Sequence, residues 1–288
     1  MEYTLVGRIP GLNHLIIKYL LCSGALVGLF TGFIACGAEN YRADLKDDIV
    51  SVTDNSSNSG NEDYYGIHAK DGWINLPIPM KFGENVPEKN ISMIKKAIHS
   101  WETAIGKTLF NFTGTHKGVH GDSFTELYDS LTGDSVNGHY FDYDWDKTGK
   151  HKAVLGTTIW STPLSTVDKI VTADIRYNLQ EYIMGDALVD LSEGNKIIVD
   201  LESLAIHEAG HLLGLAHVDE ETDEYSIMNP SLFIGEGLTT RIPSRGDIER
   251  IQKIYGCSGD ACDVDATLLK LEEMNNTDSE DDEDGSGA

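Results

Sequence analysis

The chain has 288 residues and a formal net charge of −25 at pH 7. That length fits one globular domain with flanking segments. The acidic balance argues against nucleic acid or an anionic membrane surface as a partner, because either would repel the chain.

The first 36 residues are predicted to be a targeting segment. Arg8 and Lys18 supply positive charge, and residues 19–35 form a largely apolar stretch that ends at Ala35-Cys36. This ending resembles a bacterial lipoprotein signal, in which the cysteine becomes lipidated. A plain cleaved signal and an uncleaved anchor helix are the alternatives. All three predict an extracytoplasmic protein, either a bacterial outer-membrane or cell-surface lipoprotein or a secreted one.

Residues 37–66 are polar and lack helical or strand periodicity, which predicts a flexible tether. Residues 73–82 predict an opening strand, in which Pro77 and Pro79 favour a sheet edge or an irregular start. Apolar residues then recur at helical spacing over residues 91–105 and Gly106 ends the run, which predicts an amphipathic helix facing the core. Residues 109–112 suggest the next strand.

Residues 121–150 are rich in Asp, Gly and Tyr and predict no regular element. Five aspartates there could supply calcium oxygens, although their spacing matches no defensible calcium loop, and a solvated loop is the alternative. They are Asp129, Asp134, Asp142, Asp144 and Asp146. His139 and His151 flank the stretch and are assigned to no metal. Residues 152–161 and 170–178 are apolar-rich with partial alternation and predict paired strands.

Three histidines lie close together between His207 and His217. On a helix, His207 and His211 project from one face, one turn apart, and neutral imidazole is a good zinc ligand. Gly214 suits the left-handed conformation that ends a helix, so the chain could turn back and bring His217 in as the third ligand. Three protein ligands with one open position are typical of a catalytic zinc site.

Glu208 follows the first histidine and is expected to face a water in the open metal position, where it could take the water's proton. Asp200 can cap this helix at its N-terminus. A buried helix with hydrogen-bonded histidines is the competing interpretation. It is disfavoured because three of the ten histidines of the chain gather in this one segment.

The motif resembles that of the metzincin metalloproteases, which also have a methionine-containing turn below the metal. Ser226-Ile227-Met228-Asn229-Pro230 is similar to that turn, with Met228 as the expected apolar floor. Pro230 stands where the astacin and serralysin branches place a tyrosine ligand. Residues 244–256 resemble the closing helix of matrixin catalytic domains. The chain is thus most similar to the matrixin branch, over roughly residues 68–257, as a bacterial matrixin-like lipoprotein.

The resemblance implies an α+β fold, with a mixed twisted β-sheet and two long helices in an upper subdomain. A small lower subdomain would hold the Met-turn and the C-terminal helix. It implies a zinc endopeptidase that cleaves protein or peptide substrates by metal-activated water, with Glu208 as general base. The strand around Leu155 and Gly156 would offer its edge to an extended substrate; a strand wholly inside the sheet is the alternative.

The resemblance also bears on latency and on the substrate pocket. Residues 231–243 would wall the pocket for the residue after the scissile bond. Matrixin zymogens usually cap the zinc with a propeptide cysteine, and no cysteine lies between Cys36 and Cys257. An aspartate of the tether could block the metal instead.

The last predicted elements follow the Met-turn. Ser244 and Asp247 predict a capping box at the start of a final helix. Cys257 and Cys262 are close enough to suggest a small disulfide loop in an oxidising compartment, with two unpaired thiols as the alternative. Residues 258–288 are acidic and predict a disordered tail.

These predictions divide the chain into a targeting segment (1–36), a tether (37–66), a catalytic domain (67–257) and a tail (258–288). We expect a monomer with one catalytic zinc ion. Whether calcium also binds is left open by the spacing of the five aspartates. The competing function is a non-catalytic surface lipoprotein with structural zinc and acidic segments that bind calcium or a protein. A zinc enzyme that processes a single partner is a third possibility.

Overall fold

The computed structural model describes residues 41–44, 49–51, 64–117, 136–162 and 168–277. All of them belong to one unit of the chain, residues 38–288. The predicted targeting segment with Cys36, and most of the predicted tether, lie outside the described residues. Within the described residues, we find no helix with the length and apolar character needed to cross a bilayer.

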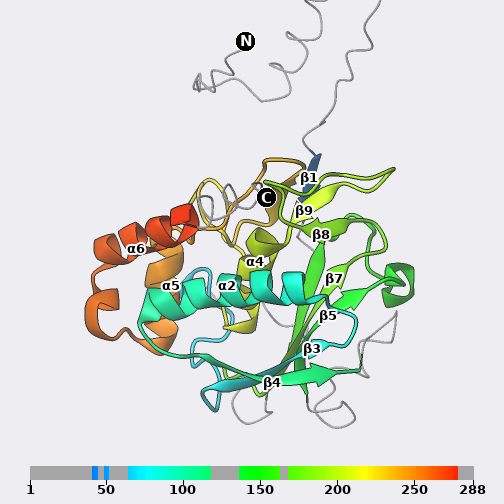
Figure 1. Cartoon of the computed structure of the whole chain (residues 1–288). Coiled ribbons are helices and arrows are strands. Elements are labelled where there is room, and N and C mark those ends of the chain that lie inside the picture. The colour runs from blue at the N-terminus through cyan, green and yellow to red at the C-terminus, as the bar shows by residue number, and fades with distance from the viewer. Residues whose placement is uncertain (1–40, 45–48, 52–63, 118–135, 163–167, 278–288) are drawn as a thin grey trace, which may run out of the picture. The chain divides into compact units, whose positions relative to one another are not determined.

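A six-stranded mixed sheet is the largest element of the fold (Figure 1). Strand β6 is antiparallel to β7, and all other neighbours are parallel, in the order β2-β6-β7-β5-β3-β4. The strands are β2 (Ile49–Ser51), β3 (Ile78–Gly83), β4 (Phe110–His116), β5 (Asn137–Asp142), β6 (Gly156–Ser161) and β7 (Thr172–Asn178).

Two short strand pairs accompany this sheet. Strands β8 (Ile183–Gly185) and β9 (Ile198–Asp200) are parallel, and β1 (Tyr41–Asp44) is antiparallel to β10 (Ser231–Ile234). The helices are α2 (Glu88–Ile105), α4 (Leu201–Leu212), α5 (Arg245–Tyr255) and α6 (Val264–Thr277). Two 3₁₀ turns are η2 (Trp145–Thr148) and η3 (Gly259–Cys262). This arrangement confirms the predicted α+β class.

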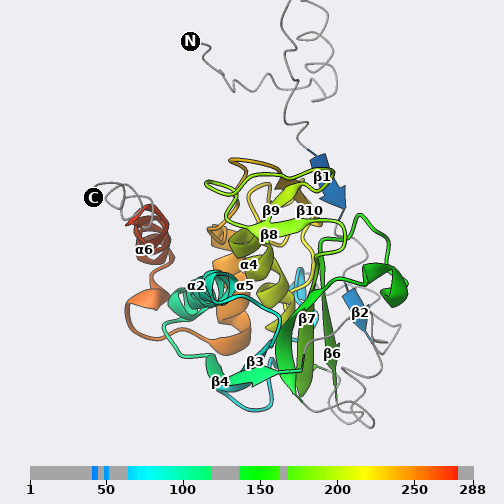
Figure 2. The same cartoon turned by 45° about the vertical axis from the view of Figure 1, so that its right-hand side comes forward.

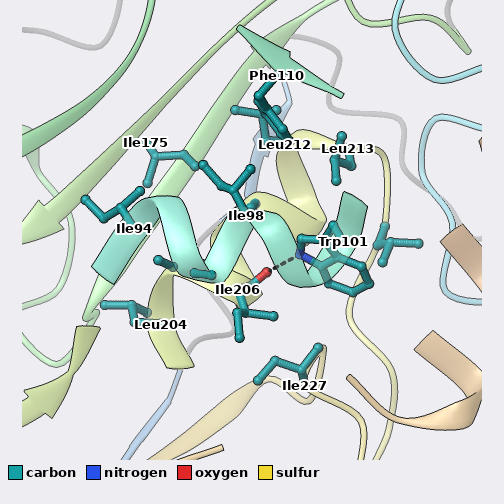
Figure 3. Close-up of a cluster of buried hydrophobic side chains, with 14 of the residues drawn as sticks. Ile94, Ile98, Trp101, Phe110, Ile175, Leu204, Ile206, Leu212, Leu213 and Ile227 are labelled. Carbon is teal, nitrogen blue, oxygen red and sulfur yellow. Dashed lines mark hydrogen bonds between the residues drawn. The ribbon is translucent and has the colours of Figure 1, made fainter. Parts of the chain in front are cut away.

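Helices α2 and α4 pack against each other, and α4 also packs against β6 and β7 (Figure 2). The core lies between these layers. Trp101 of α2 is fully buried there, and its indole N–H donates to the Ile206 carbonyl of α4 at 2.9 Å (Figure 3). The two helices are therefore joined by apolar contact and by one buried hydrogen bond.

The predicted helix at 91–105 is confirmed and begins three residues earlier, at Glu88. It ends at Gly106, whose φ of 68° is left-handed. The predicted opening strand is shorter, since β3 begins at Ile78. Of the two alternatives, the edge position is wrong, because β3 lies between β5 and β4, whereas the irregular start agrees with a ladder to β5 that begins only at Met80. Pro79 is tolerated because the ladder with β5 starts only at Met80.

Helix α6 corrects the prediction of a disordered tail for residues 264–277. Leu271 is 2% exposed, and Val264 and Leu268 also pack against the core. The acidic composition of this segment outweighed its few apolar residues at helical spacing in the prediction. These apolar residues have a core to pack against only in the folded chain. Residues 278–288 lie outside the described part. Before α6, Cys257 and Cys262 form the predicted disulfide.

The predicted tether contains two short strands rather than uninterrupted coil. Strand β1 extends β10, and β2 lies parallel to β6 with Ile49 opposite Thr158. Backbone groups of existing strands supply this pairing, so it needs no side-chain periodicity. Consequently β6 is not an open edge: it lies between β2 and β7.

Replacing Trp101 by Ala should lower the free energy of unfolding by about 3–5 kcal/mol, because a large buried ring is lost. Trp101→Phe keeps one aromatic ring but loses the indole donor and some buried volume, so its loss should be smaller, about 1–2 kcal/mol. Urea unfolding of the metal-free protein measures both without a contribution from metal binding. Equal losses of unfolding free energy in the two variants would contradict the larger contribution assigned to apolar packing.

Candidate metal centre

Helix α4 carries His207 and His211, and the surrounding fold fixes its direction. Asp200 caps its N-terminus as predicted, with its carboxylate accepting from the Ser203 N–H at 3.0 Å. All residues of α4 are buried. Any rotation of the helix would therefore disrupt close packing on every side, and this cost fixes where both imidazoles point.

The carbonyl groups at the C-terminal end of α4 have side-chain donors from distant parts of the chain. Such carbonyls have no partner inside the helix and must find one elsewhere. The pairs are His68 Nε2 to His211 O at 2.8 Å, Trp73 Nε1 to Leu212 O at 2.7 Å, and Tyr255 Oη to Leu213 O at 2.8 Å. Together they fix the residue at which the helix stops.

Gly214 then reverses the chain, as predicted. Its φ of 108° is a conformation that L side chains rarely adopt. Its carbonyl accepts from the backbone N–H groups of His68 and Ala69, at 2.8 and 3.2 Å. A Cβ at this position would lie 2.8 Å from the Ala69 carbonyl oxygen. The turn thus needs glycine both for its backbone angle and for its space, and it leads directly to His217.

The three predicted ligands converge. Nε2 of His211 lies 3.0 Å from Nε2 of His207 and 3.2 Å from Nε2 of His217. All three potential ligand atoms lie within 4.8 Å of one another. Among the described residues, this is the one cluster of three or more His, Cys, Asp or Glu side chains that could share an ion.

The protonation of these imidazoles suits a cation. Nδ1 of His207 faces the Ile227 carbonyl at 2.7 Å, and Nδ1 of His211 faces the Leu215 carbonyl at 2.9 Å. A carbonyl only accepts, so each Nδ1 carries the proton and each Nε2 has a free lone pair. Burial lowers the pKa of His207 to about 4 and that of His217 to about 3, so both are neutral at pH 7.

Lone pairs that face each other at 3.0 Å in a buried site repel unless a positive ion lies between them. Three neutral imidazole nitrogens form the ligand set of catalytic zinc sites. The residues present therefore fit a zinc ion. The carbonyl partners of His207 and His211 orient the rings, as the second shell of a metal site does.

Glu208 is fully buried beside this cluster. Its Oε2 accepts from the Thr158 hydroxyl at 2.5 Å, whereas its Oε1 has no hydrogen-bond partner in the protein. Burial raises the pKa of Glu208 to about 8, and the Thr158 hydroxyl opposes that rise. A bound dication nearby would favour the ionised carboxylate. Glu208 thus has one oxygen fixed and one oxygen free.

Met228 packs against α4, and its predicted role as the floor under the imidazoles remains a prediction. It is fully buried, and a Cβ added at Gly210 of α4 would collide with its sulfur. Asp247 of α5 holds the turn in place. Its carboxylate accepts from the Ser226 hydroxyl at 2.6 Å and from the Ile227 N–H at 2.8 Å. Because the Ile227 carbonyl orients His207, α5 acts on the metal ligand through this turn.

The segment after the Met-turn is tied to the start of α4. Arg241 is 8% exposed, and its guanidinium pairs with Asp200 and Asp186. The Thr240 N–H donates to the Ser203 hydroxyl at 2.7 Å. The same carboxylate, Asp200, therefore caps the helix and anchors the predicted pocket wall.

The three histidines come together, and the predicted substrate-binding residues lie on β6 and just before it. Leu155 is buried in the core, and Gly156 lies against Glu208. Their proposed contact with substrate remains a prediction. The predicted calcium ligand Asp142 is engaged otherwise, since its carboxylate pairs with Arg176 and accepts the Asp144 N–H. Asp129 and Asp134 lie outside the described residues.

Sequence reasoning did not find several residues that orient the site. They are His68, Trp73, Thr158 and Tyr255. Each comes from a different part of the chain and carries no local motif. The sequence predicted Asp247 only as part of a helix cap. Its hydrogen bonds to the Met-turn could not be inferred from its position in the sequence.

The fold and the three-histidine cluster define a metalloprotein of the catalytic zinc type. Residues 83–256 match the family described as Matrixin (peptidase M10). Because the match covers more than half of the chain, the protein belongs to the matrixin family.

Curated relatives match a shorter part of the chain. The chain is 45% identical to Metalloendoproteinase 2-MMP of Arabidopsis thaliana over 60 residues, which is 21% of this chain and 15% of the relative. It is 46% identical to Metalloendoproteinase 5-MMP of the same plant over 59 residues, 20% of this chain and 15% of the relative. The chain thus aligns with only a small part of each relative's length.

Replacing Gly214 by Ala should weaken zinc binding by about tenfold or more and lower stability by about 1–3 kcal/mol. The added Cβ would strain the backbone and push against Ala69, which displaces His217. Gly237→Ala is the matched control, since its φ of 74° is also positive but no atom lies within 4 Å of the new Cβ. Competition with a chromophoric chelator measures the affinity. Equal zinc affinity in both variants would argue against this role of the turn.

Proposed function

We propose that this matrixin is a zinc-dependent endopeptidase that cleaves protein or peptide substrates. The observation that carries the proposal is the arrangement of four side chains. Three imidazole nitrogens converge on one point, and a buried carboxylate beside them keeps one oxygen without a protein partner. The family membership and the names of the relatives support the same activity.

His207, His211 and His217 would hold the ion. When bound, zinc supplies Lewis acidity that polarises a carbonyl and acidifies a bound water. Glu208 is the proposed general base: its free Oε1 accepts the proton of the attacking water. The same carboxyl group then donates that proton to the departing amine. The surrounding burial excludes other water and strengthens these interactions.

The substrate is proposed to bind as an extended strand near β6, beside Leu155 and Gly156. An extended peptide is recognised through its backbone, and β6 contacts Glu208 through Thr158. In the structure β2 already pairs with β6 from Thr158 to Trp160. A substrate strand can use this part of β6 only after β2 has left.

The location is proposed to be extracytoplasmic. The disulfide between Cys257 and Cys262 fits an oxidising compartment. Export through the N-terminal segment, with lipidation of Cys36 on a bacterial surface, stays a prediction, as do a monomeric state and a calcium ion. The proposed division into targeting segment, tether and catalytic domain is likewise a prediction.

Replacing Glu208 by Gln should leave one zinc ion per chain and reduce hydrolysis of unfolded casein by about 10³-fold or more, because the base is lost. Glu221→Gln is the control, an exposed glutamate just beyond His217 that should keep full activity. Zinc content is measured alongside the cleavage rate. Full activity of Glu208→Gln, or zinc binding without any hydrolysis by the wild type, would refute the proposal; the latter would favour a non-catalytic zinc protein.

Removal of residues 1–63 should raise kcat/KM on a short peptide by at least about fivefold, because β2 then no longer competes for β6. The three residue pairs between β2 and β6 are worth ~1 kcal/mol, which corresponds to about that factor. A chain that lacks only residues 1–37 retains β1 and β2 and is the matched control. Both are assayed with one fluorogenic peptide at equal zinc content. Equal rates for the two chains would show that β2 does not compete with substrate.

A further inference from the structure

We propose that Thr158 is a positioning residue for Glu208, which it holds so that one defined carboxylate oxygen faces the reacting water. This inference rests on the proposed endopeptidase function. Thr158 belongs to β6, and its Oγ1 lies 2.5 Å from Glu208 Oε2. Both side chains are fully buried.

The direction of this hydrogen bond follows from the chemistry of the two groups. In the zinc-loaded protein the carboxylate is ionised and only accepts, so the hydroxyl donates. Hydrogen bonds to ionised acceptors are the stronger kind, and burial removes competing water. Oε2 is therefore occupied, whereas Oε1 has no protein partner. The contact selects which of the two otherwise equivalent oxygens is available to act.

The strand makes Thr158 a rigid donor. Thr158 is paired with Ile175 of β7, a pairing that does not depend on β2. Its β-branched side chain also has few rotamers available. The Glu208 carboxylate, at the end of a flexible side chain, is thus held from a fixed point of the sheet.

Gly156 shapes the same face of β6. It lies two residues before Thr158, so both positions face α4. A Cβ at Gly156 would lie 2.8 Å from Glu208 Oε1 and 3.3 Å from its Cδ. Any larger residue would push the free oxygen away. Strand β6 therefore offers a donor to one oxygen and leaves space beside the other.

A purely structural role is the competing explanation. Thr158 Oγ1 also lies 2.9 Å from the backbone carbonyl of Glu208, so it could serve to join β6 to α4. A structural bond would affect folding or zinc retention. A positioning bond would affect the turnover step while substrate binding and zinc content stay the same.

The test compares Thr158→Val, which has nearly the same shape and no hydroxyl, with Thr158→Ser, which keeps the hydroxyl. Thr157→Val is the matched control, because Thr157 is also buried but faces the other side of β6. For each full-length variant, zinc content, kcat and KM on a fluorogenic peptide, and the crystal structure of the zinc-loaded protein are measured.

Thr158→Val should lower kcat by about 10- to 100-fold, the effect of a misplaced catalytic group, while KM and zinc content remain those of the wild type. Thr158→Ser should restore most of kcat, and Thr157→Val should retain it. The Glu208 carboxylate should keep one orientation in Thr158→Ser and lose it in Thr158→Val. Wild-type kcat in Thr158→Val, or a loss explained by missing zinc or by KM alone, would overturn the inference.

The crystal structures separate the two proposals. If the zinc-loaded wild type cleaves nothing, the proposed function fails, and the orientation of Glu208 in the variants still decides whether Thr158 holds it. If the wild type is active and Glu208 keeps its orientation in Thr158→Val, the positioning role alone fails.

Discussion

The burial of helix α4 on all sides is the constraint on which the metal centre depends. A helix that cannot rotate fixes two imidazoles, but the third ligand comes from beyond its end. The end of the helix is therefore as important as its direction. It is set by hydrogen bonds to three successive carbonyl groups and by the angle of Gly214. Apolar packing provides the direction, and polar capping provides the stop.

Two buried carboxylates near the site each bind partners from more than one element. Asp200 caps α4 and also binds Arg241, so the start of the helix and the segment after the Met-turn are held by one carboxylate. Asp247 caps α5 and also binds the Met-turn that orients His207. These buried polar groups link the elements that flank the metal centre, and each is satisfied by partners from more than one element.

Much of the fold and the centre of the site could be predicted from local pattern. The apolar spacing of residues 91–105 predicts α2, and the spacing of three histidines around one glycine predicts the ligand set. Both work because the signal lies within one helix or one turn, where sequence distance determines spatial distance. The edge position, one of the two alternatives for β3, and the disordered tail expected for residues 264–277 were wrong. Each depends on what another part of the chain places beside it.

By itself, the sequence determined the residue types that can bind zinc and move a proton, because His207, Glu208, His211 and His217 follow helical and turn spacing. Only the tertiary structure decided which side chains orient them. His68, Thr158 and Asp247 reach the site from three separate segments, and no local periodicity relates them to α4. It also decided that β2 covers β6, since backbone pairing at a sheet edge depends on an available partner strand and not on side-chain pattern.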